Sequence, residues 1–472
     1  MIINSLLEQT PILCVSPINN KKCDNCLKLF KQKGHLEAHK NRKQPCKTSI
    51  LIEQYIEKNV QEPLTTVIKI EPYQPLISIT NKLMDSHHTT TQHPIESHSS
   101  NQMTDDKHNS FVYQTMLTCI GNKRKLVSNI RNILNDIRTL LSKERLNIVD
   151  GFAGSSVVSR ELSYIANNLY TNDMELYSYL MAYCYLVNPS ICQKERILNH
   201  LRIMNEIAEK GPYHEGIICK LYAPKDTKNI KEGERCFYTR ENALIIDTLR
   251  RYITENVEED IVNYCLVPLL NKASINTNTA GVFKGFYKKD NIGCFGGKGE
   301  CALSRITKPI RLDTPVWNDS VYTAFPSNKD INVLVDELPD NIDVMYLDPP
   351  YNQHPYGSNY FMLNVIATYK EPSEISNVSG IPTNWNKSNY NKHKSAIDSM
   401  KQLLSSGLSK SKYLVISYNN EGIITDSDWK TLFEPYNVKK YEITYDTYKG
   451  SRNLKGRSDK VIEIMYLVSK KE

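Results

Sequence analysis

An apolar run that stops abruptly at two prolines constrains this fold more than any other stretch of the chain. Residues 342–347 read IDVMYL, and Asp348, Pro349, Pro350 and Tyr351 follow directly. A short apolar run bounded by turn residues predicts a buried strand of a parallel sheet, and the prolines cannot continue its hydrogen-bonded ladder. Because ligands of open α/β sheets bind just beyond the carboxyl ends of strands, Asp348 and Tyr351 are expected at a site of chemistry.

These residue types suit a flat ring that carries an amino group. An exocyclic amine on a purine or pyrimidine is a poor nucleophile, because its lone pair is delocalised into the ring. The Asp348 carboxylate and the Pro349 carbonyl can accept hydrogen bonds from its two N–H groups and so localise that lone pair. Tyr351 can stack on the ring, a contact worth about 1–3 kcal/mol per base. For the tetrapeptide alone, a strand-to-loop turn with a capping aspartate is the alternative.

The tetrapeptide at 348–351 resembles the signature of amino-methyltransferases that act on adenine N6, and more loosely on cytosine N4, with S-adenosylmethionine as the methyl donor. Two upstream stretches resemble the cofactor motifs of the same family. Gly121 and Lys123 precede an amphipathic helix with Leu126, Ile130, Ile133, Leu134 and Ile137 on one face. Residues 147–156, NIVDGFAGSS, predict a strand, a glycine turn and then a helix from about 157 to 169, and Asp173 is expected at the end of a second strand.

The resemblance implies a set of residues that contact S-adenosylmethionine. We expect Lys123 to pair with its methionyl carboxylate and Asp173 to accept hydrogen bonds from its ribose hydroxyls. The family commonly has an aromatic residue two positions before the glycine, where this chain has Cys119. The complete expected set is Gly121, Lys123, Asp150, Phe152, Gly154, Asp173 and Asp348.

A long interval separates the cofactor motifs from the Asp348 stretch. Helices are predicted at 192–210, 241–256 and 259–271, beside glycine- and lysine-rich loops with interleaved aromatic residues at 280–289 and 293–299. Such loops suit phosphate and base contacts, although a mobile surface loop has the same composition. Residues 187–330 lie where the Dam-like order of motifs has its target-recognition region. With strands expected near 412–418 and 461–468, the resemblance spans residues 113–468.

The N-terminal part contains a candidate zinc site. Cys23 and Cys26 are followed by His39, and Phe30 and Leu36 occupy the core positions of a small ββα finger. Cys46 is the best fourth ligand, with His35 as the competitor. The stretch resembles a C2H2-type finger in a Cys-Cys-His-Cys variant, in which zinc supplies about 10–16 kcal/mol of apparent binding energy. Whether this finger binds DNA, RNA or protein stays open.

Charge and composition divide the chain into three parts. Residues 20–47 contain nine basic residues and two acidic ones, a surplus equal to the +7 of the whole chain, which suits a polyanionic partner. Residues 86–110 are polar and almost without apolar side chains, so 48–110 is predicted to be a flexible linker. The predicted parts are a zinc finger at 20–47, this linker, and a methyltransferase domain at 111–472.

The cysteine and apolar patterns bear on the compartment. Twelve cysteines without regular spacing favour a reducing environment. The first residues lack the pattern of a secretory signal, and no run of eighteen apolar residues occurs, so no contact with a membrane is expected. We expect an intracellular protein of the cytoplasm or another DNA-containing compartment, with a cell infected by a large DNA virus as one setting.

Together these patterns predict an α/β protein: a Rossmann-like, S-adenosylmethionine-dependent methyltransferase sheet with an inserted, mostly helical target-recognition region and a small N-terminal ββα zinc finger. The expected activity is site-specific methylation of adenine N6 in double-stranded DNA, with the target base flipped out of the duplex. Cytosine N4, RNA and a protein glutamine are alternative substrates. A catalytically silent zinc-finger DNA-binding protein is the alternative of a different class, and a nuclease is poorly supported. The recognition sequence and oligomeric state stay open.

Overall fold

The computed structural model describes residues 21–22, 29–30, 108–113, 117, 119–446 and 460–471. The predicted zinc ligands Cys23, Cys26, His39 and Cys46 lie outside them, as does most of the predicted linker. The chain divides into two compact units, Met1–His93 and Pro94–Glu472. In the first unit, β1 (Lys21–Lys22) pairs with β2 (Leu29–Phe30) in an antiparallel hairpin.

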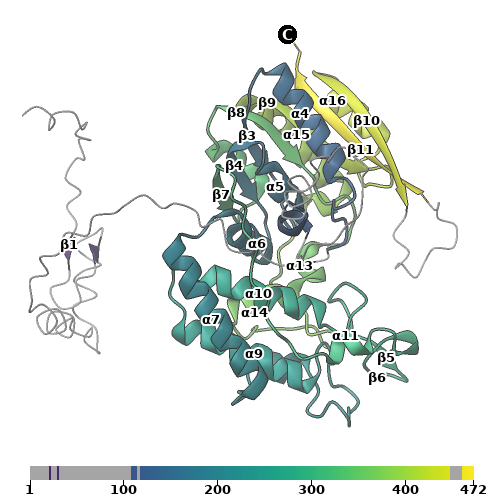
Figure 1. Cartoon of the computed structure of the whole chain (residues 1–472). Coiled ribbons are helices and arrows are strands. Elements are labelled where there is room, and N and C mark those ends of the chain that lie inside the picture. Colours follow the sequence, from purple (N-terminus) through teal and green to yellow (C-terminus); the bar gives the residue numbers. More distant parts are fainter. Residues whose placement is uncertain are drawn as a thin grey trace, which may run out of the picture. The chain divides into compact units, whose positions relative to one another are not determined.

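A seven-stranded sheet in the order β10-β11-β9-β8-β3-β4-β7 forms the centre of the second unit (Figure 1). Five strands are parallel: β3 (Leu146–Asp150), β4 (Ala166–Asn172), β7 (Thr323–Ser327), β8 (Ile342–Leu347) and β9 (Ser411–Asn419). Strand β11 (Lys460–Lys470) runs antiparallel between β9 and β10 (Tyr436–Asp446). The chain runs outward from β3 to β7 and then returns to β8, so the strand order reverses between β3 and β8. The predicted α/β class with a mostly parallel sheet is confirmed.

Strand β8 is buried at all six positions because helices cover both faces of the sheet. Val344 and Tyr346 pack with α4 (Val127–Leu140) and α5 (Val157–Leu162). Met345 and Leu347 point to the opposite face, as the two-residue period of a strand requires. That face is covered by α12 (Ile331–Glu337), α15 (His393–Lys410) and α16 (Asp426–Phe433).

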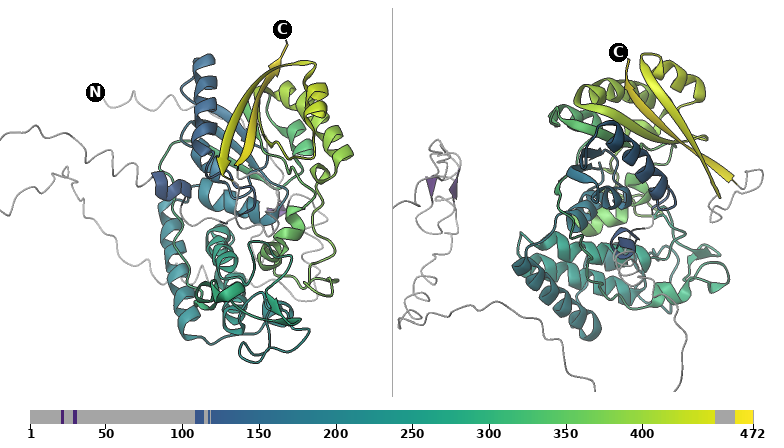
Figure 2. Two further views of the ribbon diagram at one scale, coloured as in Figure 1. Left: turned by 90° about the vertical axis from the view of Figure 1, so that its right-hand side faces the viewer. Right: turned by 45° about the horizontal axis from the view of Figure 1, so that its top comes forward.

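The helices that do not cover the faces of the sheet gather at one end of this unit (Figures 1 and 2). They share one apolar core, to which residues after β8 also contribute. Of the predicted recognition region 187–330, residues 323–327 form β7 in the main sheet. The elements at this end are α7 (Ile191–Lys210), α8 (Ile217–Tyr222), α9 (Arg240–Asn256), α10 (Val262–Ile275), β5 (Lys288–Lys289), β6 (Ile292–Gly293), η1 (Lys298–Glu300), α11 (Leu303–Thr307), α13 (Tyr356–Asn359) and α14 (Phe361–Thr368). Helix α6 (Leu176–Leu186) packs both on β4 and β7 of the sheet and on α10 and α14 of this end. The short helix η2 (Asn389–Asn391) contacts α15 instead.

The predicted helix at 157–169 is wrong in its second half. Helix α5 ends at Leu162, and β4 already begins at Ala166. Strand β4 pairs along the whole of β3, from Ala166 opposite Leu146 to Thr171 opposite Asp150. Pairing with the neighbouring strand therefore overrides the local helical pattern.

Candidate functional site

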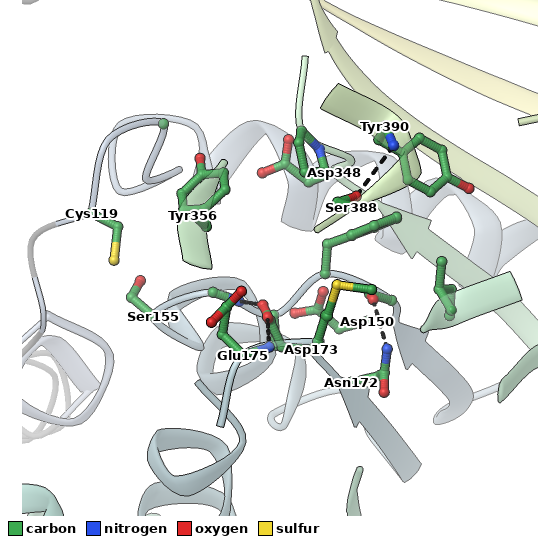
Figure 3. A pocket seen from close by; sticks show the side chains of 18 of the residues that line it. Cys119, Asp150, Ser155, Asn172, Asp173, Glu175, Asp348, Tyr356, Ser388 and Tyr390 are labelled. Atoms are coloured by element: carbon green, nitrogen blue, oxygen red, sulfur yellow. Dashed lines mark hydrogen bonds between the residues drawn. The ribbon is translucent and has the colours of Figure 1, made fainter. Parts of the chain in front are cut away.

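A pocket opens at the carboxyl ends of β3, β4 and β8, where the strand order reverses (Figure 3). All seven residues of the expected cofactor set line it: Gly121, Lys123, Asp150, Phe152, Gly154, Asp173 and Asp348. Of the predicted catalytic residues, Asp348 and Pro350 line it, whereas Pro349 and Tyr351 are not among its lining residues. Figure 3 shows Asp348 across the pocket from Asp150, Asp173 and Glu175.

The loop after β3 brings bare backbone to the pocket. Gly154 has φ +52°, and a Cβ at this position would meet no atom within 4 Å. Its N–H donates to Asp173 Oδ2 over 2.8 Å, and its carbonyl accepts from Ser178 Oγ over 2.5 Å. The glycine therefore faces open space, while its backbone is held from the end of β4.

Asp150, the last residue of β3, is fully buried. Its Oδ2 accepts a hydrogen bond from Ser159 Oγ over 2.5 Å, whereas Oδ1 has no hydrogen-bond partner in the described part of the chain. Burial raises the pKa of Asp150 to about 7; the Ser159 hydrogen bond opposes this rise and the negative charge of Asp348 adds to it. The hydrogen-bonding capacity of Asp150 Oδ1 is thus not used by the described residues.

Two acids follow β4 in the pocket. Asp173 lies there as predicted, and its Oδ1 accepts from the Glu175 N–H over 2.8 Å. Glu175 was missed from the sequence, although two acids two positions apart after a strand are a usable signal. Its Oε2 accepts from Asn364 Nδ2 over 2.7 Å. Burial raises the pKa of Glu175 to about 7, and the charge of Asp173 adds to that rise.

Asn172 ties neighbouring strand ends together behind this wall. Its side chain donates to the carbonyls of Gly151 and Lys329 over 3.2 and 3.0 Å, and it accepts from Ser327 Oγ over 2.9 Å. Asp330, which caps α12 through the Asn332 N–H, also lines the pocket. Neither residue was predicted, because their roles depend on the pairing of β4 with β7.

Lys123 lies between two carboxylates. Its Nζ is 2.7 Å from Asp348 Oδ1 and 3.2 Å from Glu463 Oε1 of β11. Burial opposes the charge on Lys123, but the two acids hold the pKa of Lys123 well above its usual value. Burial raises the pKa of Asp348, and the ammonium opposes that rise. Lys123 therefore lines the pocket as expected, but its charge is engaged by the protein's own acids and not presented alone to a methionyl carboxylate.

The segment after Tyr351 holds the N-terminal motif in place. Tyr356 Oη donates to the Ile120 carbonyl over 2.8 Å, and the Ile120 N–H donates to Tyr360 Oη over 2.7 Å. Gly121 has φ +78°, and a Cβ there would lie 3.0 Å from Tyr356 Oη. Cys119 lines the pocket at the position where an aromatic is common, and burial raises the pKa of its thiol, so this thiol stays neutral.

Tyr351 lies close to the ion pair. Lys123 Nζ is 5.9 Å from the centroid of its ring, and the ring packs edge-on against Tyr418. The Tyr351 carbonyl accepts from the Ile423 N–H over 2.9 Å. The loop that follows β9 therefore fixes the chain on which Tyr351 sits.

The described residues contain neither a metal-ligand cluster nor a membrane-spanning helix. Within the described ranges, no cluster of three or more His, Cys, Asp or Glu side chains is arranged to hold a metal ion. None of the helices in these ranges combines the length and apolar character needed to cross a membrane.

The similarity to known proteins that a family model detects lies within the second unit of the chain. The family described as D12 class N6 adenine-specific DNA methyltransferase matches residues 120–431. The Type II methyltransferase M.CviAII of Paramecium bursaria Chlorella virus 1 is 28% identical over 323 residues, which cover 67% of this chain and 87% of that protein. The Type II methyltransferase M.NlaIII of Neisseria lactamica is 26% identical over 368 residues, covering 74% and 98% of the two chains. The chain therefore belongs to the D12 class N6 adenine-specific DNA methyltransferase family and is a DNA methyltransferase that modifies adenine at N6.

Proposed function

We propose that the pocket binds S-adenosylmethionine and that Asp348, Pro349 and Tyr351 hold a flipped adenine beside it. The observation that carries this proposal is that Asp348, at the end of β8, lines the same pocket as the glycine loop after β3. When bound, S-adenosylmethionine supplies an activated methyl group on a sulfonium sulfur. Everything else in the mechanism is binding and orientation by this chain.

The pocket residues fit such a cofactor. The open space in front of Gly154 admits a ligand against the backbone, and Asp150 Oδ1 is a buried oxygen without a hydrogen-bond partner among the described residues. Asp173 and Glu175 offer carboxylates that can accept hydrogen bonds from ribose hydroxyls. Gly121, Phe152 and Gly154 bring two backbone turns and an aromatic ring to the same cavity.

Asp348 is suited to orient the target amine. The Asp348 side chain keeps 17% of its surface exposed, although Lys123 contacts one of its oxygens. It can accept one N6–H bond, while the Pro349 carbonyl accepts the other, so the nitrogen lone pair is localised. Alignment of two reactants contributes about 7–11 kcal/mol, whereas extrusion of a base costs only a few. Positioning therefore suffices without a covalent enzyme intermediate.

Target recognition is proposed to use the helical end of the second unit. Lys288 and Lys289 of the β5–β6 hairpin are exposed, and Lys288 Nζ lies 5.0 Å from the centroid of the Phe286 ring. Asn278 supports this hairpin by donating to the carbonyls of Cys236 and Cys294 over 2.8 Å each. Cations and aromatic rings on one supported loop suit phosphate and base contacts and site-specific binding of double-stranded DNA.

A zinc finger is proposed for the N-terminal unit, with Cys23, Cys26, His39 and Cys46 as ligands. The antiparallel pairing of Lys21–Lys22 with Leu29–Phe30, on either side of Cys23 and Cys26, supports a ββα finger. Mass spectrometry of the purified full chain is expected to find one zinc per chain and to find none in a Cys23→Ser, Cys26→Ser variant. An unchanged zinc content in that variant would contradict this assignment.

Base flipping and stacking can be tested together. Duplex DNA with 2-aminopurine at the target adenine is expected to gain fluorescence when the intact enzyme binds. A Tyr351→Ala variant is expected to bind S-adenosylmethionine normally but to lose about 1–3 kcal/mol of affinity for this DNA. Native DNA affinity in that variant would contradict the proposed stacking.

A further inference from the structure

Glu463 is a buried acid on the antiparallel strand β11, and only 1% of its side chain is exposed. Since β11 runs antiparallel to β9, its first residues lie beside the carboxyl end of β9, and Glu463 pairs with Asn419, the last residue of that strand. Ser417 Oγ donates to Glu463 Oε1 over 2.6 Å. The Glu463 carboxylate is thus held from the sheet directly beneath the pocket.

The Lys123 ammonium lies between this carboxylate and that of Asp348. The distances from Lys123 Nζ are 3.2 Å to Glu463 and 2.7 Å to Asp348. The two acidic oxygens are therefore at most about 6 Å apart, close enough for like charges to interact strongly in a buried site. A buried carboxylate is costly unless it is paired and hydrogen-bonded, and Lys123 and Ser417 do this for Glu463.

We propose that Glu463 is a positioning residue that shares the Lys123 ammonium with Asp348 and so keeps Asp348 a strong hydrogen-bond acceptor for the target amine. This inference rests on the proposed role of Asp348. An ammonium paired with Asp348 alone would neutralise most of its negative charge. A second carboxylate paired with the same ammonium leaves more negative charge on Asp348, which makes Asp348 a stronger hydrogen-bond acceptor for the target amine.

Several other ionisable groups face Asp348. Asp150 approaches from β3 and Tyr346 from β8, while Tyr351 and Tyr356 approach from the segment after β8. Burial raises the pKa values of these three tyrosines, so they stay neutral in the range where Asp348 titrates. The acidic side of the pH profile of methyl transfer therefore reports on Asp348 and Asp150, with Lys123 and Glu463 as the charged groups nearest to Asp348.

The test is the pH dependence of single-turnover methyl transfer in the full-length enzyme, with duplex DNA and saturating S-adenosylmethionine. Glu463→Gln keeps the shape of the side chain and removes its charge. It is expected to lower the transfer rate about tenfold at pH 8 and to move the acid limb about one unit downward, because Lys123 then pairs with Asp348 alone. Lys123→Met is expected to move the acid limb upward, because two carboxylates then face each other.

Glu442→Gln is the matched control. Glu442 lies on the neighbouring strand β10, opposite Ile464, and its side chain is 55% exposed. Neither its rate nor its acid limb is expected to change. Thermal unfolding and S-adenosylmethionine affinity show that each variant is folded and loaded.

An acid limb of Glu463→Gln that stays at the native pH would overturn the inference. If Glu463→Gln does not fold, an unshifted limb in Lys123→Met would overturn it too, since charge sharing through Lys123 is the mechanism. Failure of the proposed function is a separate result, because Asp348→Ala would then still transfer methyl groups at the native rate. Inactive Asp348→Ala with an unshifted Glu463→Gln would reject the role of Glu463 only.

Discussion

Replacement of Gly154 by alanine tests the cofactor cradle most cleanly. A non-glycine residue in the left-handed region costs about 1–2 kcal/mol, and Gly154 has φ +52°. The new methyl group would meet no protein atom within 4 Å, so it would project into the space proposed for the cofactor without a clash with the rest of the chain. One extra methyl group in a filled site costs about 1–3 kcal/mol, so the dissociation constant for S-adenosylmethionine should rise by about 10–200-fold.

Gly233→Ala supplies the matched control for that experiment. Gly233 has φ +83°, is exposed, and its Cβ would also meet no atom within 4 Å, but it does not line the pocket. Calorimetric titration with S-adenosylmethionine and thermal unfolding should show similar losses of stability in both variants and a loss of affinity only in Gly154→Ala. Native affinity in Gly154→Ala, or an equal loss in Gly233→Ala, would refute the placement of the cofactor against this loop.

Three further outcomes are expected. The pKa of Asp150 is about 7 in the folded chain and near 4 in the unfolded chain. Between these two pH values the folded state holds a proton that the unfolded state has released. The free energy of unfolding therefore falls by up to about 4 kcal/mol from pH 4 to pH 7. Asp150→Asn should therefore unfold at a higher temperature than the native chain at pH 8 but not at pH 4, and equal differences at both pH values would contradict this. Tyr356→Phe loses the hydrogen bond to the Ile120 carbonyl and should weaken S-adenosylmethionine binding by about 0.5–1.5 kcal/mol. Tyr213→Phe loses a similar bond to the Ala208 carbonyl and should bind S-adenosylmethionine normally. Equal binding curves for the two variants would argue against a role of the Tyr356 contact. The double variant Lys288→Ala, Lys289→Ala should have a shallower slope of log binding constant against log salt concentration, by about one unit per lost phosphate contact. Replacement of the exposed Lys401 on α15 by alanine should leave this slope unchanged. An unaltered slope in the double variant would show that the hairpin does not contact DNA.

Local patterns in the sequence were enough to predict the strands that present the site. The IDVMYL run became β8, and NIVD became the last four residues of β3, because a run buried on both faces of a sheet is apolar at consecutive positions. Four residues of the apolar face predicted for the helix after Gly121 are buried in α4, and the fifth, Leu126, is buried at its N-cap. The glycine turn after β3 and the two prolines after β8 then predicted that both strands end at the same edge of the sheet.

Contacts across the sheet could not be predicted in the same way. Glu463 reaches Lys123 only because β11 inserts between β9 and β10, and nothing local in the residues around Glu463 predicts that pairing. The hydrogen bonds between Ile120 and the hydroxyls of Tyr356 and Tyr360 span more than two hundred residues of chain. Lys123 was consequently assigned to a ligand carboxylate, although two acids of the chain itself surround it.

The central claim is that Asp348, at the tip of β8, orients the amine that receives the methyl group. Its most direct test is to measure methylated nucleosides in duplex DNA treated with the intact enzyme and with Asp348→Ala, after both have been shown to bind S-adenosylmethionine equally. The account predicts N6-methyladenine with the intact enzyme and a rate at least about a thousandfold lower with Asp348→Ala. Transfer by Asp348→Ala within tenfold of the native rate, or N4-methylcytosine as the main product of the intact enzyme, would contradict it.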